Sequence, residues 1–369
     1  MTHKALCIIG LSICCGHLHA QNDSLLLGRL LKTPLHYIAS KTQTAPDIDG
    51  NLTDPAWQTA AWTEYFSDIE GDIRPKPLYQ TRVKMLWDDQ YLYIGAELEE
   101  PNVWAYVTGH DEVVFRDNDF EVFVNPDNNA RNYFEIETNA IKTIFDLFLP
   151  EPYKNGGDPL VGWDAQGLKK AVHINGTLND PRDKDHGWTV EMAIPIWSIS
   201  MGNQPETPHP GSLWRINFSR VEWDTDAKDG KYVKRTDPAT QKTLPEHNWV
   251  WSPQGVIDMH FPERWGYLLF ADTIARTPSR ATAFTLPLSE KMKNRLWELY
   301  YRQSFYFRDH GTYAENLSAL NIDSVTNMDG HGTLMKMEAT PHTYAAILVC
   351  ADTGEAFIID SKGIINRAR

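Results

Sequence analysis

Residues 115–129 read FRDNDFEVFVNPDNN, and the alternation inside this stretch predicts a β-strand. Phe120, Val122 and Val124 fall on one face of the strand, whereas Asp119, Glu121, Phe123 and Asn125 fall on the other. The Asn-Pro-Asp-Asn-Asn segment that closes it is typical of a turn that reverses the chain. One buried face is enough to hold a strand in register, so packing does not require the two carboxylates. They are therefore candidates for contact with a ligand.

Short alternating strands recur on both sides of this stretch. Residues 82–87 and 91–98 predict a hairpin around a turn at 88–90. Further strands are predicted at residues 132–138, 143–148, 169–176, 188–194, 213–223 and 265–270. There is no βαβ alternation and no glycine-rich phosphate loop, which argues against a nucleotide-binding fold. The pattern predicts a mainly β protein, an antiparallel β-sandwich of the immunoglobulin or jelly-roll kind.

The strand at 132–138 carries more acidic residues. Phe134 and Ile136 are predicted to face the core, while Glu135 and Glu137 face away. If this strand pairs with residues 119–124, these carboxylates and Glu121 form an exposed acidic strip. The alternative is that the strip is only a solvated sheet face.

The tryptophans divide into two expected groups. The 13 Trp residues exceed what a core of this size needs, which leaves some rings for binding. Most of the Trp residues are expected in the core, and Trp57, Trp87, Trp188 and Trp214 are assigned to packing.

Composition excludes some partners and indicates export. The net charge of −14, without a dense Lys/Arg run, argues against nucleic acid. Residues 1–20 combine Lys4, an apolar run and a final Ala20, which is typical of a cleaved signal peptide. The run is shorter than the roughly 20 residues of a spanning helix, and no later segment is long enough. A lipoprotein anchored through Cys14 or Cys15 is the alternative, and otherwise Cys350 remains as a buried thiol with no disulfide partner.

The pattern changes along the chain and defines four segments. After residues 1–20 comes a lead-in at 21–46 with a short helix near 25–31, and then the β-sandwich at 47–272. A boundary is predicted at 277–280. Residues 288–309 have the spacing of one helix, ended by Gly311, and strands follow at 332–338, 344–351 and 355–360. Residues 273–369 are therefore predicted to form a small α+β domain.

Several ordered pieces of the sandwich region resemble the family 9 carbohydrate-binding modules. They are Ile48-Asp49-Gly50 with Trp57, VKMLWDDQYLY at 83–93, NDFEVFVNPDNN at 118–129, GWTVEMAIP at 187–195, Asn217, and Trp251-Ser252-Pro253 leading to 266–268. The resemblance covers about residues 47–272. It implies a calcium-containing β-sandwich that holds a sugar between two Trp rings, with polar side chains binding the hydroxyl groups. The small domain has a fainter likeness to pilin-like domains.

Carried over residue by residue, the resemblance implies a sugar site that differs from the family pattern. Glu121 falls on the sugar-binding glutamate, with Asp119 beside it. Phe115 stands at the first Trp, Met259 lies near the second, and Glu135 replaces a binding arginine. Rings that are candidates to replace the missing platform are Trp104, Tyr106, Trp163, Trp223 and Trp249.

The expected function is non-catalytic binding of a plant- or host-type oligo- or polysaccharide in the periplasm or outside the cell, in support of polysaccharide breakdown. One alternative is a hydrolase of O-glycosyl bonds that uses Glu121 and Glu135 as paired carboxylates. Another is a structural or assembly protein with a relict sugar site. No GxSxG motif or poised Cys supports a nucleophile. The oligomeric state stays open.

Calcium is a candidate cofactor. The oxygen-rich loops are Asp127 with Asn128 and Asn129, and residues 224–230. Neither has EF-hand spacing, and an ordinary turn is the alternative for each. His110, next to Asp111, is the one histidine noted near residues 115–129. No histidine pair has zinc-ligand spacing.

Overall fold

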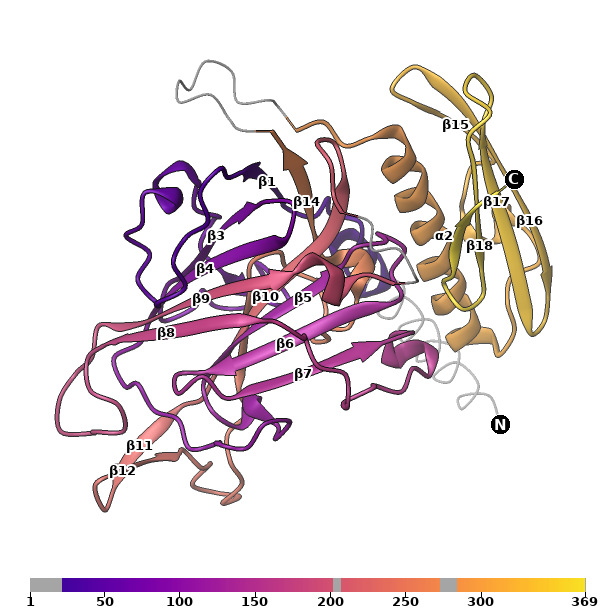
Figure 1. Ribbon diagram of the computed structural model, residues 1–369. Coiled ribbons are helices and arrows are strands. Elements are labelled where there is room, and N and C mark those ends of the chain that lie inside the picture. The colour runs from indigo at the N-terminus through magenta and orange to yellow at the C-terminus, as the bar shows by residue number, and fades with distance from the viewer. Residues whose placement is uncertain (1–21, 202–206, 273–283, 369) are drawn as a thin grey trace, which may run out of the picture. The chain divides into compact units, whose positions relative to one another are not determined.

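The computed structural model describes residues 22–201, 207–272 and 284–368 (Figure 1). The chain divides into two compact units. One is Pro34–Phe284, and the other joins the described residues before Pro34 to Thr285–Arg369. The predicted signal peptide at 1–20 and the boundary predicted at 277–280 lie outside the described residues.

The larger unit is built on one curled sheet of 12 strands, in the order β7-β6-β5-β10-β14-β1-β3-β4-β9-β8, with β13 pairing β10 and β2. The strands are β1 (His36–Lys41), β2 (Ser67–Asp68), β3 (Thr81–Trp87), β4 (Tyr91–Glu99), β5 (Asp119–Asn125), β6 (Tyr133–Asn139), β7 (Ile144–Leu149), β8 (Lys169–Asn175), β9 (Gly187–Pro195), β10 (Leu213–Glu222), β13 (His247–Val250) and β14 (Gly266–Ala271). A separate hairpin joins β11 (Thr225–Lys228) to β12 (Lys231–Lys234).

The two ends of this sheet enclose the main core. A single hydrophobic cluster draws side chains from both halves, including Val83, Ile94 and Met192 on one side and Phe120, Ile136 and Phe218 on the other. Trp57, Trp87, Trp188 and Trp214 are all buried, as predicted for packing residues. Burial of apolar area on this scale is the main favourable term in folding. The predicted mainly β fold with a sandwich arrangement is confirmed.

The predicted strands of the larger unit match observed ones closely, but β1, β2, β11, β12 and β13 were not predicted. The hairpin predicted at 82–98 is β3 and β4, which pair in antiparallel register. The segment treated as a lead-in contains β1, which runs parallel to both β14 and β3 and links the two halves of the sheet. A strand without a neighbouring hairpin turn gives no local pairing signal, so the sequence pattern missed it. The sheet is therefore not wholly antiparallel.

Glu191 on β9 explains why three of the separated sequence pieces occur together. Its carboxylate accepts hydrogen bonds from Trp57 Nε1 at 2.6 Å, from Gly50 N at 2.6 Å and from Asp49 N at 3.0 Å. Gly50 has φ +96°, and a Cβ there would lie 2.8 Å from the backbone nitrogen of His173. Only glycine fits this position without strain.

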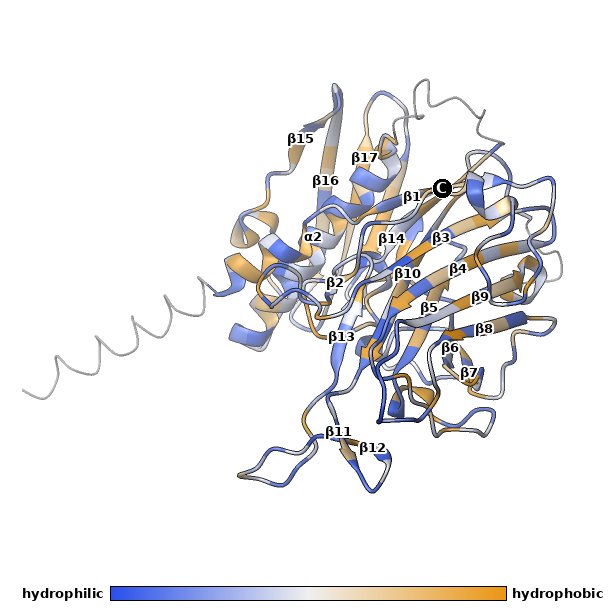
Figure 2. Cartoon of the chain, turned by 90° about the vertical axis from the view of Figure 1, so that its left-hand side faces the viewer, coloured by the Kyte–Doolittle hydropathy of each residue, from blue (hydrophilic) through white to orange (hydrophobic). Residues whose placement is uncertain are grey.

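The smaller unit contains the predicted helix and meander. The helix α2 (Leu288–His310) ends at Gly311, whose φ is +72°. The strands β15 (Val325–Met328), β16 (His331–Thr340), β17 (Thr343–Cys350), β18 (Ala356–Asp360) and β19 (Ile365–Arg367) form a five-stranded sheet in sequence order. Both hydrophobic and hydrophilic residues are visible on α2 in Figure 2, and Met292, Leu296 and Leu299 are buried.

Two further features belong to this unit. Residues 22–30 are helical, as predicted near 25–31, and Asp23 forms a 2.6 Å ion pair with Arg308. Cys350 is a buried free thiol on β17, as predicted. Across both units, none of the described helices combines the length and the apolar character that crossing a bilayer needs.

Candidate functional site

Strand register brings four carboxylates to one face of β5 and β6. In the antiparallel pair, Glu121 lies opposite Glu137, and Glu135 lies opposite Phe123. Asp119 precedes Glu121 by two residues and so shares its face. The other face of both strands packs in the main core, as the alternation predicted. We call Asp119, Glu121, Glu135 and Glu137 the acidic cluster.

The acidic cluster is buried, and the prediction of an exposed acidic strip was wrong. The exposed fractions are 0% for Asp119, 6% for Glu121, 5% for Glu135 and 1% for Glu137. A second hydrophobic cluster covers this face of the sheet. It consists of Val114, Phe123, Tyr133, Phe145, Leu147, Leu149 and Trp265, with Val107, Val161 and Met259 packed against it. Five of its seven buried members lie on β5, β6 and β7 themselves, while Val114 and Trp265 come from other parts of the chain.

The carboxylates approach one another closely and have few hydrogen-bond donors. Asp119, Glu121 and Glu137 each offer an oxygen within 4.8 Å of the others. Val221 N donates to Asp119 at 3.1 Å, and Phe115 N donates to Glu137 at 3.2 Å. Among the described residues, Asp119 Oδ2 and Glu135 Oε2 have no hydrogen-bond partner.

Burial changes the acidity of every member of the cluster. It raises the pKa of Glu121 to about 7, against a lowering contribution from the Ser219 hydroxyl. Burial, followed by the charge of Glu121, raises the pKa of Glu135 to about 8. The pKa values of Asp119 and Glu137 are also raised well above their usual range, by burial first and by neighbouring carboxylates second. Unless positive charge is supplied, the cluster holds protons near neutral pH.

Aromatic rings border the acidic cluster near Phe115, whose backbone N–H donates a hydrogen bond to Glu137. The Phe115 side chain is 40% exposed, and its backbone oxygen accepts a 2.9 Å hydrogen bond from Trp223 Nε1. Lys234 Nζ lies 3.3 Å from the centre of the Trp223 ring. Two of the predicted ligand-binding residues are therefore neighbours at this border.

Tyr153 and His260 are two residues that sequence reasoning missed. Burial, followed by the charges of Glu135 and Glu137, raises the pKa of Tyr153 to about 12. The Tyr153 ring is 43% exposed and stands 4.4 Å from the ring of His260. Met259 lies near the position of the second Trp in the family pattern. His260 is the next residue, so its ring lies close to that position. Neither residue lies in a periodic segment that would have singled it out.

The other predicted rings lie in different surroundings. Trp249 is 3% exposed and belongs to the main core. Trp104 is 4% exposed and its ring lies 5.4 Å from that of Tyr106, while Trp163 packs 4.8 Å from Phe134. Of the candidate replacement rings, Trp223 is the one seen to contact Phe115.

The two loops considered for calcium form ordinary turns. Asn125 Oδ1 accepts from Asn129 N at 3.0 Å, and Asn129 Nδ2 lies 3.4 Å from Asp127 Oδ2. The second loop is the β11–β12 hairpin, turned at Asp229 and Gly230, which have φ values of 53° and 75°. Neither arrangement gathers three carboxylates.

His110 joins a second acidic group, with Asp111, Asp146 and Asp164. His110 Nε2 lies 2.7 Å from Asp164 Oδ1, and this hydrogen bond raises the pKa of the imidazole. Asp146 accepts a 2.6 Å hydrogen bond from Ala165 N. This group thus carries its own basic partner, unlike the acidic cluster.

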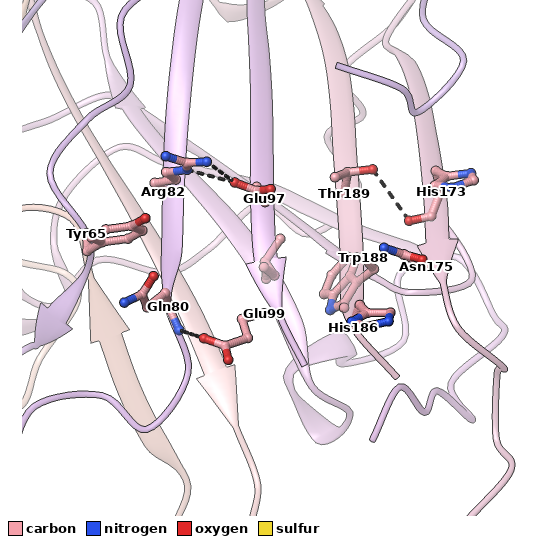
Figure 3. A pocket seen from close by; sticks show the side chains of 12 residues that line it. Tyr65, Gln80, Arg82, Glu97, Glu99, His173, Asn175, His186, Trp188 and Thr189 are labelled. Atoms are coloured by element: carbon pink, nitrogen blue, oxygen red, sulfur yellow. Dashed lines mark hydrogen bonds and ion pairs between the residues drawn. The ribbon is translucent and has the colours of Figure 1, made fainter. Parts of the chain in front are cut away.

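An open groove lies on the other half of the sheet (Figure 3). It has a volume of about 450 Å³, and its walls include Tyr65, Gln80, Arg82, Glu97, His173 and His186, which we call the polar groove. Arg82 and Glu97 form an ion pair at 2.6 Å, and the Tyr65 ring is 49% exposed. This groove was not predicted from the sequence, because its residues come from the separate strands β3, β4, β8 and β9 and from adjoining loops.

The chain belongs to the family described as carbohydrate family 9 binding domain-like, whose match covers residues 48–253. It is 24% identical over 203 residues to Exoglucanase XynX of Acetivibrio thermocellus, covering 55% of this chain and 16% of that protein. It is 25% identical over 187 residues to Endo-1,4-beta-xylanase C of Paenibacillus barcinonensis, covering 50% of this chain and 14% of that protein. The chain therefore matches only a small part of each curated relative.

One solved structure with a similar chain is a family 9 carbohydrate-binding module from Caldicellulosiruptor kristjanssonii in complex with cellotriose. It is 15% identical with a TM-score of 0.41, and the alignment covers 68% of this chain and all of that one.

Proposed function

We propose that the larger unit binds a neutral plant- or host-type glycan without catalysis and supports polysaccharide breakdown in an exported compartment. The observation that carries this proposal is the position of Glu121. The family resemblance aligns Glu121 with the sugar-binding glutamate, and Phe115, whose side chain is 40% exposed, adjoins the same cluster through its backbone hydrogen bond to Glu137.

The mechanism is recognition by stacking and hydrogen bonding. Phe115 and Tyr153 offer flat apolar faces to the C–H groups of a sugar ring, and carboxylate oxygens accept hydrogen bonds from hydroxyl groups. Glu121 and Glu135 are the members of the cluster with the largest exposed fractions, 6% and 5%. A cluster of acids repels anionic sugars, so a neutral glycan fits it better.

The polar groove is the competing surface for the same ligand class. Its side chains also donate and accept hydrogen bonds, and Tyr65 offers a ring. A glycan array with and without calcium, run on the protein and on Glu121→Gln and Tyr65→Ala variants, separates the two surfaces. We expect Glu121→Gln to lose the glycan signal and Tyr65→Ala to keep it. Loss of signal in Tyr65→Ala alone would move the site to the groove.

A hydrolase is the second candidate, because the carboxylates have raised pKa values. Glycoside hydrolysis uses two carboxyl groups about 5 to 10 Å apart, one of them protonated near neutral pH. Glu121, with a pKa of about 7, meets the second condition. Release of reducing sugar that stops in Glu121→Gln while binding persists would establish this function. Binding without release supports the non-catalytic proposal.

Export is proposed from the sequence of residues 1–20 alone. Mass spectrometry of the protein recovered from its host measures the mature N-terminus. A chain that starts near Gln21 in the periplasmic or culture fraction supports the proposal, and an uncleaved chain in the cytoplasm opposes it.

A further inference from the structure

Strand register brings a histidine and the free thiol to one end of the sheet in the smaller unit. In the antiparallel pair of β16 and β17, Cys350 lies opposite Thr333. His331 begins β16, two residues before Thr333, so it shares the face on which Cys350 lies. This end of the sheet therefore holds an imidazole and a thiol on a single face.

The turn that follows β17 adds a carboxylate. Asp352 lies in this turn, and the backbone holds the turn against the start of β16, because Ala351 N donates to Gly332 O at 2.9 Å. We call His331, Cys350 and Asp352 the thiol cluster. Backbone pairing sets the spacing of its members, so the cluster is formed before any ligand binds.

The polar atoms of the thiol cluster converge. One ligand atom from each residue lies within 4.8 Å of the other two, and His331 Nδ1 is 3.2 Å from Asp352 Oδ2. Cys350 is 0% exposed, whereas the side chains of His331 and Asp352 are 40% and 56% exposed. The sulfur thus lies beneath two exposed groups, which can adjust around a small ion.

The types of ligand in the thiol cluster favour zinc. Zn²⁺ binds thiolate, imidazole and carboxylate, whereas Ca²⁺ takes oxygen ligands. Hydrogen bonds with Thr353 lower the pKa of the Cys350 thiol, which favours the thiolate form that metals bind. Cys350 is a free cysteine, so no disulfide competes for its sulfur within the described residues.

The distances are close to those of a zinc site. Zinc lies about 2.3 Å from sulfur and about 2.0 to 2.2 Å from nitrogen or oxygen, so tetrahedral ligands stand about 3.4 to 3.6 Å apart. The 3.2 Å between His331 Nδ1 and Asp352 Oδ2 is near this separation. The sulfur lies within 4.8 Å of both ligand atoms, so a movement of about 1 Å by the exposed side chains completes the geometry.

We propose that the thiol cluster binds one zinc-type divalent cation through Cys350 Sγ, the His331 imidazole and the Asp352 carboxylate, with water as the fourth ligand. The site lies in the smaller unit, outside residues 48–253 that match the carbohydrate-binding family. It requires no glycan, so its test is independent of the proposed function.

The test uses Co²⁺ as a coloured substitute for Zn²⁺, because a bond from Co²⁺ to a thiolate gives a charge-transfer absorption band. Serine replaces Cys7, Cys14 and Cys15 in every protein compared, so that Cys350 is the one thiol of the full reference chain. The titration contains a reductant without thiols, and Zn²⁺ is added at its end. We expect the band to saturate at about one Co²⁺ per chain and to disappear when Zn²⁺ displaces Co²⁺.

Variants of the two exposed ligands show whether the whole cluster binds the ion. His331→Gln and Asp352→Asn alter the surface and should not disturb folding, and His342→Gln, in the turn between β16 and β17, is the matched control. We expect the affinity for Co²⁺, followed by the band, to be at least tenfold weaker in both ligand variants and unchanged in the control. Absence of the band in the reference chain overturns the proposal. So does full affinity in either ligand variant, or an equal loss in His342→Gln.

Discussion

Glu121 on β5 lies directly opposite Glu137 on β6, and neither side chain is more than 6% exposed. Like charges in facing positions on a sheet repel each other, and burial strengthens that repulsion. Burial raises the pKa of Glu121 to about 7 and raises that of Glu137 well above its usual range, so proton uptake relieves the repulsion near neutral pH. Such an arrangement costs stability and is typical of functional sites.

Removing one of these charges should not destabilise the protein. For Glu137→Gln, we expect a free energy of unfolding equal to or higher than that of the unmodified chain, measured with urea in the presence of a chelator at pH 8. Gln keeps an oxygen that can accept from Phe115 N, and one repulsive charge is gone. A loss above about 2 kcal/mol, typical of a broken buried hydrogen bond, would contradict the account.

Glu191 should behave in the opposite way. Glu191→Ala leaves Trp57 Nε1, Gly50 N and Asp49 N without their acceptor. Unsatisfied buried donors cost about 1 to 3 kcal/mol each, so we expect a loss of at least about 3 kcal/mol in urea unfolding.

The matched control for Glu191 is Glu97→Ala. Glu97 is a solvent-facing residue whose ion pair with Arg82 should contribute less than about 1 kcal/mol. Equal losses in the two variants would show that Glu191 does not hold these segments together.

His260 predicts a change in stability with acid. Burial lowers the pKa of its imidazole to about 4, below the ordinary value of 6.5, so the unfolded chain binds this proton more readily than the folded one. Its contribution to stability is complete above about pH 6.5 and is lost as the pH falls towards 4. Unfolding free energies measured from pH 7 to 4 should fall less steeply in His260→Gln. Identical slopes would mean that the pKa of His260 is the same in the folded and the unfolded chain.

The glycan affinity should depend on the area of the aromatic ring at position 115. Phe115→Trp should tighten binding about fivefold and Phe115→Ala should weaken it by at least that factor, since an aromatic contact contributes about 0.5 to 1.5 kcal/mol. The side chain is 40% exposed, so the Tm should change little. Competition binding with the glycan identified on the array measures both changes. Equal affinities for all three proteins would remove Phe115 from the site.

The sequence predicted much of the fold because its information was local. The two-residue alternation in β5 and β6 placed Phe120 and Glu121 on opposite faces, and both assignments hold. The helix α2 and its end at Gly311 followed from spacing and one glycine. Where a single segment determines its own structure, its local sequence pattern is sufficient to predict that structure.

The features that were not predicted from the sequence depend on contacts between segments far apart in the chain. The acidic cluster shares its face of the sheet with a hydrophobic cluster that includes Val114 and Trp265, which are about 150 residues apart. The parallel pairing of β1 with β14 joins residues more than 200 positions apart. No periodic pattern in the sequence predicts such long-range contacts.

The most direct test of the central claim is calorimetric titration of the array-identified glycan into the unmodified chain, Glu121→Gln and Tyr65→Ala. We predict saturable binding by the unmodified chain, affinity at least tenfold weaker in Glu121→Gln, and an unchanged affinity in Tyr65→Ala. Equal affinity in the unmodified chain and Glu121→Gln would contradict the assignment of the glycan site to the acidic cluster.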